Sequence, residues 1–181
     1  MSQAVPAAAA EGAAVVVNYA SSKEGADSEA LLGSADRVVD EITGADGKAI
    51  AVQANVAKKA EVERLFIQTQ QTFGKLDILV NNAGIFEYLP LEDVTQEHFH
   101  KHFDLNVLEL ILTSQQGAKY FDSEGGSIIN ISSIASTTTP ATASVYSATK
   151  ASVDAVTKSL AKASSDSAWI TGETLHIAGG I

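Results

Sequence analysis

The sequence has no cysteine and little positive charge. The absence of cysteine excludes disulfides, thiolate metal sites and cysteine nucleophiles, and it is compatible with a reducing, cytoplasmic compartment. Lysine and arginine together number 12 against 22 acidic residues, which gives a formal net charge of −10. Because nucleic-acid binding depends on basic patches that neutralise phosphates, this balance argues against a nucleic-acid partner.

Long hydrophobic runs are also lacking. No apolar run approaches the roughly 18 residues of a membrane-spanning helix. The amino-terminal stretch MSQAVPAAAAEGAAVVVNYA is apolar, but it has no basic region and Glu11 and Gly12 interrupt it, so it resembles neither a signal peptide nor a membrane anchor. With 181 residues and 45% hydrophobic content, we expect one cytoplasmic domain over residues 1–181, with a buried core and no membrane partner.

Only four histidines are present, at His98, His100, His102 and His176. His98 and His102 are four residues apart, so on a helix they would share a face, as zinc ligands do. No glutamate follows His98 to complete the metalloprotease pattern H-E-x-x-H. We therefore predict no metal site.

Short apolar runs rich in β-branched residues alternate with segments of helical periodicity. The runs predicted as strands are Ala13–Tyr19, Ala49–Ala54, Leu76–Val80, Ser127–Ile131 and Glu173–Ile177. The predicted helices cover Asp36–Thr43, Glu61 to the residue before Gly74, Thr95 past Asn106 toward Tyr120, and the segment that contains Tyr146 and Lys150. Strands that alternate with helices through long connections indicate an α/β fold, in which a parallel sheet is covered by helices on both faces.

Two local features lead to further expectations. The run Ala13–Tyr19 is largely apolar, and we expect this strand to be buried on both faces. Gly25–Asp27 is echoed by Gly33–Asp36, so Ser28–Asp36 resembles a short insertion. Since connections tolerate added length at low cost, we predict that this insertion is a surface loop.

Polar side chains gather where three of the predicted strands end. These clusters are Asn18–Ser22, Asn81–Gly84 and Ser132–Ser133. In parallel α/β sheets, ligands bind outside the carboxyl ends of the strands. The coincidence predicts a ligand site at this edge of the sheet.

The segment SVYSATKASVD, Ser144–Asp154, places Tyr146 and Lys150 four residues apart. On a helix such a pair lies on nearly the same face, so the ammonium could sit beside the phenol. A pair at this spacing also arises by chance. Taken alone, it fits an ordinary amphipathic turn as well as a catalytic pair.

Four short motifs occur in order along the chain. They are NNAG at Asn81–Gly84, DLNV at Asp104–Val107, ISS at Ile131–Ser133 and YSATK at Tyr146–Lys150. Ser133 precedes Tyr146 by 13 residues. In these motifs and spacings the chain resembles the short-chain dehydrogenase/reductase family, most closely its 3-oxoacyl-carrier-protein reductases and sugar dehydrogenases. The resemblance implies a Rossmann-like doubly wound parallel sheet and a reaction with NAD or NADP.

The resemblance also implies roles for single residues in interconverting a ketone and a secondary alcohol. Hydride transfer leaves negative charge on the substrate oxygen, so the site needs a proton donor and a hydrogen-bond donor directed at that oxygen. By resemblance, Tyr146 is the general acid/base, and Lys150 favours its phenolate and holds the nicotinamide ribose. Ser133 would orient the carbonyl or alcohol of a small-molecule substrate, and Asn106 would position a water that links Lys150 to solvent.

Each of these residues also has an ordinary structural explanation. Ser133 could simply end a strand, and Asn106 could be a polar residue on an exposed helix face. The segment Asn81–Gly84 could be a turn and nothing more.

Cofactor choice depends on the residues that follow the first predicted strand. NAD-specific sites usually place an acidic residue at this strand end, where it binds the ribose 2′-hydroxyl. Here Asn18 is neutral, and Ser21, Ser22 and Lys23 would suit a 2′-phosphate, so we predict NADP, with NAD as the other possibility. By resemblance, the remaining cofactor contacts are Asn55 at the adenine, followed by Asn82, Ala83, Gly84, Tyr146 and Lys150.

Two segments of the family pattern are missing from this sequence. The first strand with its glycine-rich turn, T-G-x-x-x-G-x-G, is absent, and Ala7–Gly12 resembles only the end of the helix that follows that turn. The sixth strand and the substrate-covering helices are absent after Lys162. In the family strand order 3-2-1-4-5-6-7, the missing first strand is central, so we expect a truncated sheet of about five strands.

These gaps leave three hypotheses open. The chain is an active NADP-dependent oxidoreductase, which by resemblance would form a homo-oligomer, a dimer or a tetramer. Alternatively, it is a catalytically inactive remnant that associates through the helices after the fourth and fifth family strands, which form the main dimer face in the family. In the third hypothesis the sequence is an incomplete gene model, or an edited form, of such an enzyme and has no activity of its own.

Overall fold

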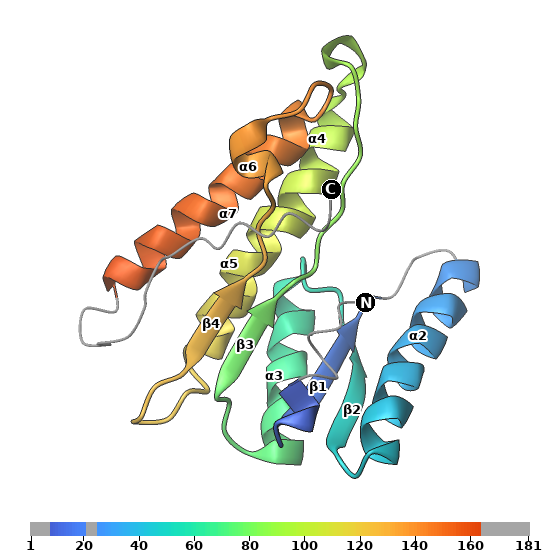
Figure 1. The fold of residues 1–181 in the computed structure, drawn as a ribbon, viewed down its shortest axis with the longest axis vertical. Coiled ribbons are helices and arrows are strands. Elements are labelled where there is room, and N and C mark those ends of the chain that lie inside the picture. The colour runs from blue at the N-terminus through green and yellow to red at the C-terminus, as the bar shows by residue number, and fades with distance from the viewer. Residues whose placement is uncertain (1–7, 21–24, 164–181) are drawn as a thin grey trace. The chain divides into compact units, whose positions relative to one another are not determined.

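The computed structural model in Figure 1 describes residues 8–20 and 25–163 of the chain. The chain divides into two compact units, Met1–Leu76 and Asp77–Ile181. In each unit parallel strands alternate with helices, as predicted for an α/β fold. The single domain expected over residues 1–181 stays a prediction. The predicted strand Glu173–Ile177 lies outside the described residues.

The first unit is built on one pair of parallel strands, β1 (Ala14–Tyr19) and β2 (Lys48–Gln53). Their register runs from Ala14 opposite Lys48 to Tyr19 opposite Gln53. The crossover helix α2 (Gly25–Gly44) joins the two strands, and α3 (Lys59–Phe73) follows β2. Both helices pack on the strand pair, beside which they lie in Figure 1.

The core of this unit comes from apolar positions of helical and strand spacing. Val62, Leu65 and Phe66 are buried on α3, and they occupy one face of the helix because they are three and four residues apart. Val17 on β1 and Val52 on β2 are buried as well. The helix predicted from Glu61 to Gly74 is therefore confirmed, with its start two residues earlier.

Two expectations for this unit are wrong. The segment Ser28–Asp36 is helical rather than a loop, because α2 runs without interruption from Gly25 to Gly44. Its sequence contains strong helix formers, Glu29–Leu32, which continue the periodicity predicted for Asp36–Thr43. The strand β1 is not buried on both faces: Val17 is its one buried residue, and within the described residues β1 pairs with β2 alone.

The second unit holds a second parallel pair, β3 (Ile78–Asn81) and β4 (Ser127–Asn130), in a register from Ile78 opposite Ser127 to Asn81 opposite Asn130. The remaining elements are η1 (Leu91–Asp93), α4 (Gln96–Phe103), η2 (Asp104–Leu108), α5 (Glu109–Gly117), α6 (Ala135–Thr138) and α7 (Ser144–Ala163). Helices α4, η2 and α5 form one nearly continuous rod in Figure 1, and η2 is a π-helical turn inside it. The helix predicted from Thr95 past Asn106 is thus confirmed, with its start capped by the Thr95 hydroxyl, which accepts from the His98 N–H at 3.1 Å.

The two faces of the β3–β4 pair differ because side chains alternate along a strand. Asn81 is buried, and it hydrogen-bonds Thr113 and Ser114 of α5. On the other face, Ile78 and Val80 remain 53% and 47% exposed. The polar network on the covered face fixes which side of the strand pair faces α5.

None of the described helices is both long enough and apolar enough to cross a membrane.

The turn between α2 and β2 makes a specific demand on Gly47. A Cβ atom there would lie 2.7 Å from Ile42 Cγ2 and 2.9 Å from the Ile42 carbonyl oxygen. Since Ile42 is buried, we expect Gly47→Ala to lower the free energy of unfolding by about 1–3 kcal/mol, measured by urea denaturation. Gly44→Ala is the matched control, because a Cβ at Gly44 meets nothing within 4 Å. Equal stabilities for the two variants would contradict the prediction.

Candidate active site

The buried side chain of Asn106, only 2% exposed, organises this site. Its Oδ1 accepts from the Ile85 N–H at 2.8 Å, and its Nδ2 donates to the Ile85 carbonyl at 2.9 Å. The second Nδ2 hydrogen is directed at Thr149 Oγ1, 3.0 Å away, and that hydroxyl donates to the Tyr146 carbonyl at 2.7 Å. Asn106 therefore ties the chain after β3 to helix α7. The alternative that it is an exposed polar helix residue is wrong.

The π-helical turn η2 explains how Asn106 reaches both partners. A π turn widens a helix locally and is frequent at functional sites. Here it places Asn106 on the inner side of the rod, between Ile85 and Thr149. Both Nδ2 hydrogens of Asn106 are used in bonds within the chain. One Oδ1 lone pair is left for a further partner such as a water.

Lys150 lies one turn beyond Tyr146 on α7 and is 6% exposed. Its Nζ donates to the Ile131 carbonyl at 2.8 Å, at the end of β4. Burial lowers the pKa of the Lys150 ammonium, and the carboxylates of Glu109 and Asp154 oppose that shift. The carbonyl and the two acidic side chains thus offset part, but not all, of the cost of burying this ammonium.

Glu109, at the start of α5, is a buried carboxyl that the sequence analysis missed. Burial raises the pKa of Glu109 to about 8, and attraction to Lys150 acts in the opposite direction. The available signal was a lone charge between Leu108 and Leu110 in an otherwise apolar stretch. Because this carboxyl is largely neutral at pH 7, its attraction for Lys150 grows as the pH rises.

Tyr146 is half-buried in the first turn of α7. Two exposed rings from the segment after β3 surround it: the ring centroid of Phe86 lies 6.1 Å and that of Tyr88 6.4 Å from the Tyr146 ring. Phe86 and Tyr88 are themselves 6.0 Å apart. No motif or spacing in the sequence marks these two residues as part of a site. Together the three rings form an apolar border around the candidate acid/base.

Ser133 follows β4, and its hydroxyl oxygen accepts from the Ala135 N–H at 3.2 Å at the start of α6. That bond uses a lone pair, so the hydroxyl proton is left for another acceptor. The neighbouring Ser132 donates to the Lys150 carbonyl at 3.3 Å, which anchors this loop to α7. Ser133 therefore lies in the loop after β4, which ends at Asn130, and it still keeps a donor for a ligand.

The segment Asn82–Gly84 is exposed at the end of β3, next to the buried polar residues. A Cβ on Gly84 would lie 3.2 Å from Asn106 Oδ1 and 3.7 Å from Lys150 Nζ. The lack of a side chain at Gly84 thus lets a ligand approach the backbone within reach of the lysine. This open strip of chain beside an ammonium fits a ribose with its hydroxyl groups. By contrast, Asn81 is buried, and its side chain hydrogen-bonds Asn130 on the neighbouring strand.

The cofactor candidates of the first unit are engaged in local structure. Asn18 donates to the Val52 and Ala54 carbonyls, both at 3.1 Å, and so fastens the end of β1 to β2. Asn55 accepts from the Ala57 N–H at 3.0 Å through its side-chain oxygen. Since both hydrogens of the Asn18 amide are committed, its side chain has only an acceptor left for a ligand. Ser21 and Ser22 lie outside the described residues.

Comparison with known proteins adds a family assignment to this geometry. The sequence profile of the family described as short chain dehydrogenase matches residues 3–171. A protein of Methylorubrum extorquens named as an uncharacterized oxidoreductase is 48% identical over 155 residues, which are 86% of this chain and 58% of that protein. A 3-oxoacyl-[acyl-carrier-protein] reductase of Synechocystis is 41% identical over 157 residues, which are 86% of this chain and 60% of the relative.

Solved structures agree with the fold. A short-chain dehydrogenase/reductase from Serratia marcescens superposes with a TM-score of 0.77 at 32% identity, covering 88% of this chain and 61% of that one. A short chain dehydrogenase from Burkholderia cenocepacia, solved in complex with NADP, has a TM-score of 0.77 at 34% identity, covering 88% of this chain and 62% of that one. The predicted Rossmann-like α/β fold is confirmed. The chain spans about three fifths of the length of these relatives.

Glu109 leads to a prediction for stability against pH. Its pKa is raised from 4.5 to about 8 in the folded chain, so between these values the folded state binds more protons than the unfolded state. The free energy of unfolding should therefore fall as the pH rises through this window, by up to about 1.4 kcal/mol per pH unit. Glu109→Gln, which cannot ionise, should lack this contribution.

Urea denaturation at several pH values from 5 to 8 measures the difference, with Glu97→Gln on the exposed face of α4 as the control. The control should follow the unsubstituted chain, while Glu109→Gln gains relative stability toward pH 8. Parallel pH profiles for all three proteins would show that Glu109 does not titrate in this way.

Proposed function

Because the chain belongs to the short-chain dehydrogenase/reductase family, we propose that it interconverts a ketone and a secondary alcohol, with a nicotinamide cofactor as the partner in hydride transfer. The observation that carries this proposal is the convergence on one place of Asn106, Lys150 and the open backbone at Gly84. Tyr146 lies one helical turn from Lys150 and shares a hydrogen-bonded chain with Asn106 through Thr149. In type, order and spacing these residues resemble the family motifs described in the sequence analysis.

Each side chain has one task in the proposed reaction. When bound, the reduced cofactor supplies a hydride to the carbonyl carbon. The Tyr146 hydroxyl gives its proton to the carbonyl oxygen, which becomes the alcohol, and the phenolate regains a proton from solvent. The Ser133 hydroxyl proton, which is not used within the loop, stabilises the charge developing on the substrate oxygen. The Lys150 ammonium favours the phenolate during the cycle.

The preferred cofactor in this proposal is NADP. Support comes from the absence of an acidic residue at the end of β1 and from Lys23 nearby, which would attract a 2′-phosphate. The Burkholderia cenocepacia relative was solved with NADP. Asn55, Ser21, Ser22 and Asn18 are the proposed contacts at the adenosine end. Since Asn18 keeps only an acceptor oxygen, we assign it a hydroxyl contact rather than a phosphate contact.

The proposed substrate is a small ketone with an apolar portion. Phe86 is 69% exposed and Tyr88 is 52% exposed, and both flank Tyr146. Exposed aromatic rings beside a proton donor favour a ligand that carries an apolar group next to its carbonyl.

The second candidate function is that of an inactive partner subunit. It is favoured by exposed apolar side chains on the helices of the second unit: Phe99 is 41%, Leu108 40% and Leu160 38% exposed. We propose self-association of this chain through these helices, as a dimer or tetramer. Light scattering on the purified chain measures the oligomeric state, and a titration with NADPH measures cofactor binding. An oligomer that binds no NADPH would support the inactive-subunit candidate and contradict the catalytic one.

Tyr146→Phe tests the proposed chemistry. With NADPH and a ketone probe, turnover should fall by about 10²–10⁴-fold because the proton donor is lost, while NADPH affinity stays within a factor of about two. Tyr88→Phe is the matched control, since it removes a hydroxyl from a neighbouring ring and keeps the ring contact. Equal losses in both variants, or unchanged turnover in Tyr146→Phe, would contradict the role of Tyr146.

The cofactor preference is tested by fluorescence titration with NADPH and NADH. NADPH should bind at least about tenfold more tightly, which corresponds to about 1.4 kcal/mol. The preference should shrink at high salt because exposed charges are screened. Equal affinities would contradict the choice of NADP, and no binding of either cofactor by the folded chain would contradict the catalytic proposal itself.

A further inference from the structure

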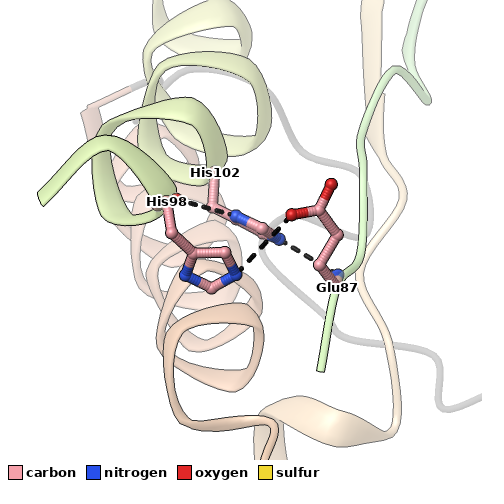
Figure 2. A group of neighbouring side chains, drawn as sticks. All are labelled: Glu87, His98 and His102. Atoms are coloured by element: carbon pink, nitrogen blue, oxygen red, sulfur yellow. Dashed lines mark hydrogen bonds and ion pairs between the residues drawn. The ribbon is translucent and has the colours of Figure 1, made fainter. Parts of the chain in front are cut away.

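Three residues of the segment after β3 are held through their backbone N–H groups. Ile85 donates to the buried amide oxygen of η2 at 2.8 Å, and Leu89 donates to the Thr142 carbonyl at 2.8 Å. Between them, the Glu87 N–H donates to His102 Nε2 at 3.1 Å, a bond drawn in Figure 2. Bonds at every second residue are typical of an extended chain, in which residues two apart lie on the same side. Three different parts of the second unit therefore fix this segment.

His102 provides the middle one of these three bonds. It is fully buried, and both of its ring nitrogens are used within the chain. Because Nε2 accepts from an N–H, it carries a lone pair, and Nδ1 bears the proton. Nδ1 then donates to the His98 carbonyl, 2.9 Å away on the preceding turn of α4. This second bond fixes the tautomer and the orientation of the imidazole, so that Nε2 is directed at the Glu87 N–H.

The bond at Leu89 involves a residue with an unfavourable backbone conformation. Thr142 has a φ angle of +63°, in the left-handed region that β-branched residues rarely adopt. Such conformations persist only where the surrounding structure enforces them, and they cluster at functional sites. The carbonyl of this strained residue is the acceptor that holds the far end of the segment.

Two exposed aromatic residues, Phe86 and Tyr88, lie between the held positions. Their ring centroids form a triangle with that of Tyr146, with sides of 6.0, 6.1 and 6.4 Å, and the ring planes are tilted by 53–58°. These values are typical of attractive aromatic pairs. Phe86 is nevertheless 69% and Tyr88 52% exposed, so more than half of each remains open to a ligand.

We propose that Phe86 and Tyr88 select ketones that carry an aromatic ring on the carbonyl carbon, and that His102 is the positioning residue that holds them beside Tyr146. This inference rests on the proposed function, because the selected ketone is the substrate that Tyr146 would protonate. Each of the two rings has a held residue on either side, and Glu87 is the held residue that both share. The bond to His102 therefore restrains both rings at once.

The selection follows from what an aromatic substrate adds to this cluster. A flat ring can stack on an exposed ring or direct its edge at it, and such pairs are attractive beyond the apolar area that they bury. A saturated ring of the same size buries a similar area without these contacts. Rings that are held in place before binding also lose little freedom when the ligand arrives.

The test compares acetophenone with cyclohexyl methyl ketone, which has a saturated ring of nearly the same size. The measured quantity is the ratio of their kcat/KM values with NADPH, because the intrinsic reactivities of the two ketones cancel when variants are compared. Phe86→Leu and Tyr88→Leu should each lower this ratio by about 3–10-fold. Phe99→Leu is the matched control and should leave the ratio unchanged, since this exposed ring contacts His100 and Phe103 rather than the cluster.

The role of His102 is tested by a pair of substitutions. His102→Leu removes the acceptor and should lower the ratio as the ring variants do, mainly by raising the KM for acetophenone. His102→Gln should preserve the ratio, because the glutamine oxygen is as many bonds from Cα as the histidine Nε2 and can accept from the Glu87 N–H. A residue with a role in stability alone would lower kcat/KM for both ketones alike. If His102→Leu does not fold, His102→Asn takes its place, since its side chain is too short to reach this N–H.

Folding of each variant is checked by circular dichroism and urea denaturation, and binding of both ketones is measured by saturation-transfer NMR with and without NADPH. Tighter binding of acetophenone that Phe86→Leu weakens would support the selection even if the folded chain reduces neither ketone, a result that contradicts the proposed function alone. The inference is overturned if the folded chain binds neither ketone or binds both equally, or if Phe99→Leu lowers the ratio as much as Phe86→Leu. An unchanged ratio in the folded variant without the His102 acceptor would overturn the positioning role.

Discussion

The second unit depends on one buried amide. Asn106 joins the chain after β3, the π-helical turn and helix α7, and every donor of its side chain is used in doing so. Losing such a residue leaves several buried partners unsatisfied at once, which costs far more than a single exposed hydrogen bond. The position of Gly84 beside Lys150 follows from this clamp, because Ile85, the next residue, is held from both its N–H and its carbonyl. The position of Gly84 at the proposed site is thus a consequence of the hydrogen bonds between Asn106 and Ile85.

Burial also determines the charge of two ionisable side chains in the second unit, Lys150 and Glu109. Burial lowers the pKa of the Lys150 ammonium, and the Asp154 carboxylate opposes that shift, while the Nζ atom donates to the Ile131 carbonyl. Glu109 is in turn kept largely neutral at pH 7 by burial. A full carboxylate there would compete with a phenolate for the lysine charge, whereas a neutral acid leaves that charge available. The burial that makes Glu109 unfavourable for stability at high pH therefore also suits the proposed role of Lys150.

Local sequence patterns predicted most of the described elements, and long-range contacts account for what they missed. The Thr95 cap, the α3 periodicity and the strands ending at Asn81 and Asn130 depend on neighbouring residues, so spacing and residue type suffice. Spacing could not show that Glu87 lies against the two histidines of α4, since this contact is made by tertiary packing. The helix through Ser28–Asp36 differs from the predicted loop for another reason: the glycine-containing repeats Gly25–Asp27 and Gly33–Asp36 are typical of a connection, but the helix formers between them continue the helix.

The proposed catalytic residues and the proposed adenosine contacts belong to different units of the chain. All four proposed catalytic residues, Asn106, Ser133, Tyr146 and Lys150, belong to the second unit, and the hydrogen bonds that position them are made within it. The proposed adenosine contacts, Asn18 and Asn55, belong to the first unit and are partly engaged in its own structure. The groups proposed for proton transfer therefore all lie in the second unit, whereas the proposed adenosine contacts lie in the first. Because the proposed reaction needs a bound hydride donor before Tyr146 can act, the proposed turnover would depend on cofactor affinity as much as on the arrangement of the acid/base.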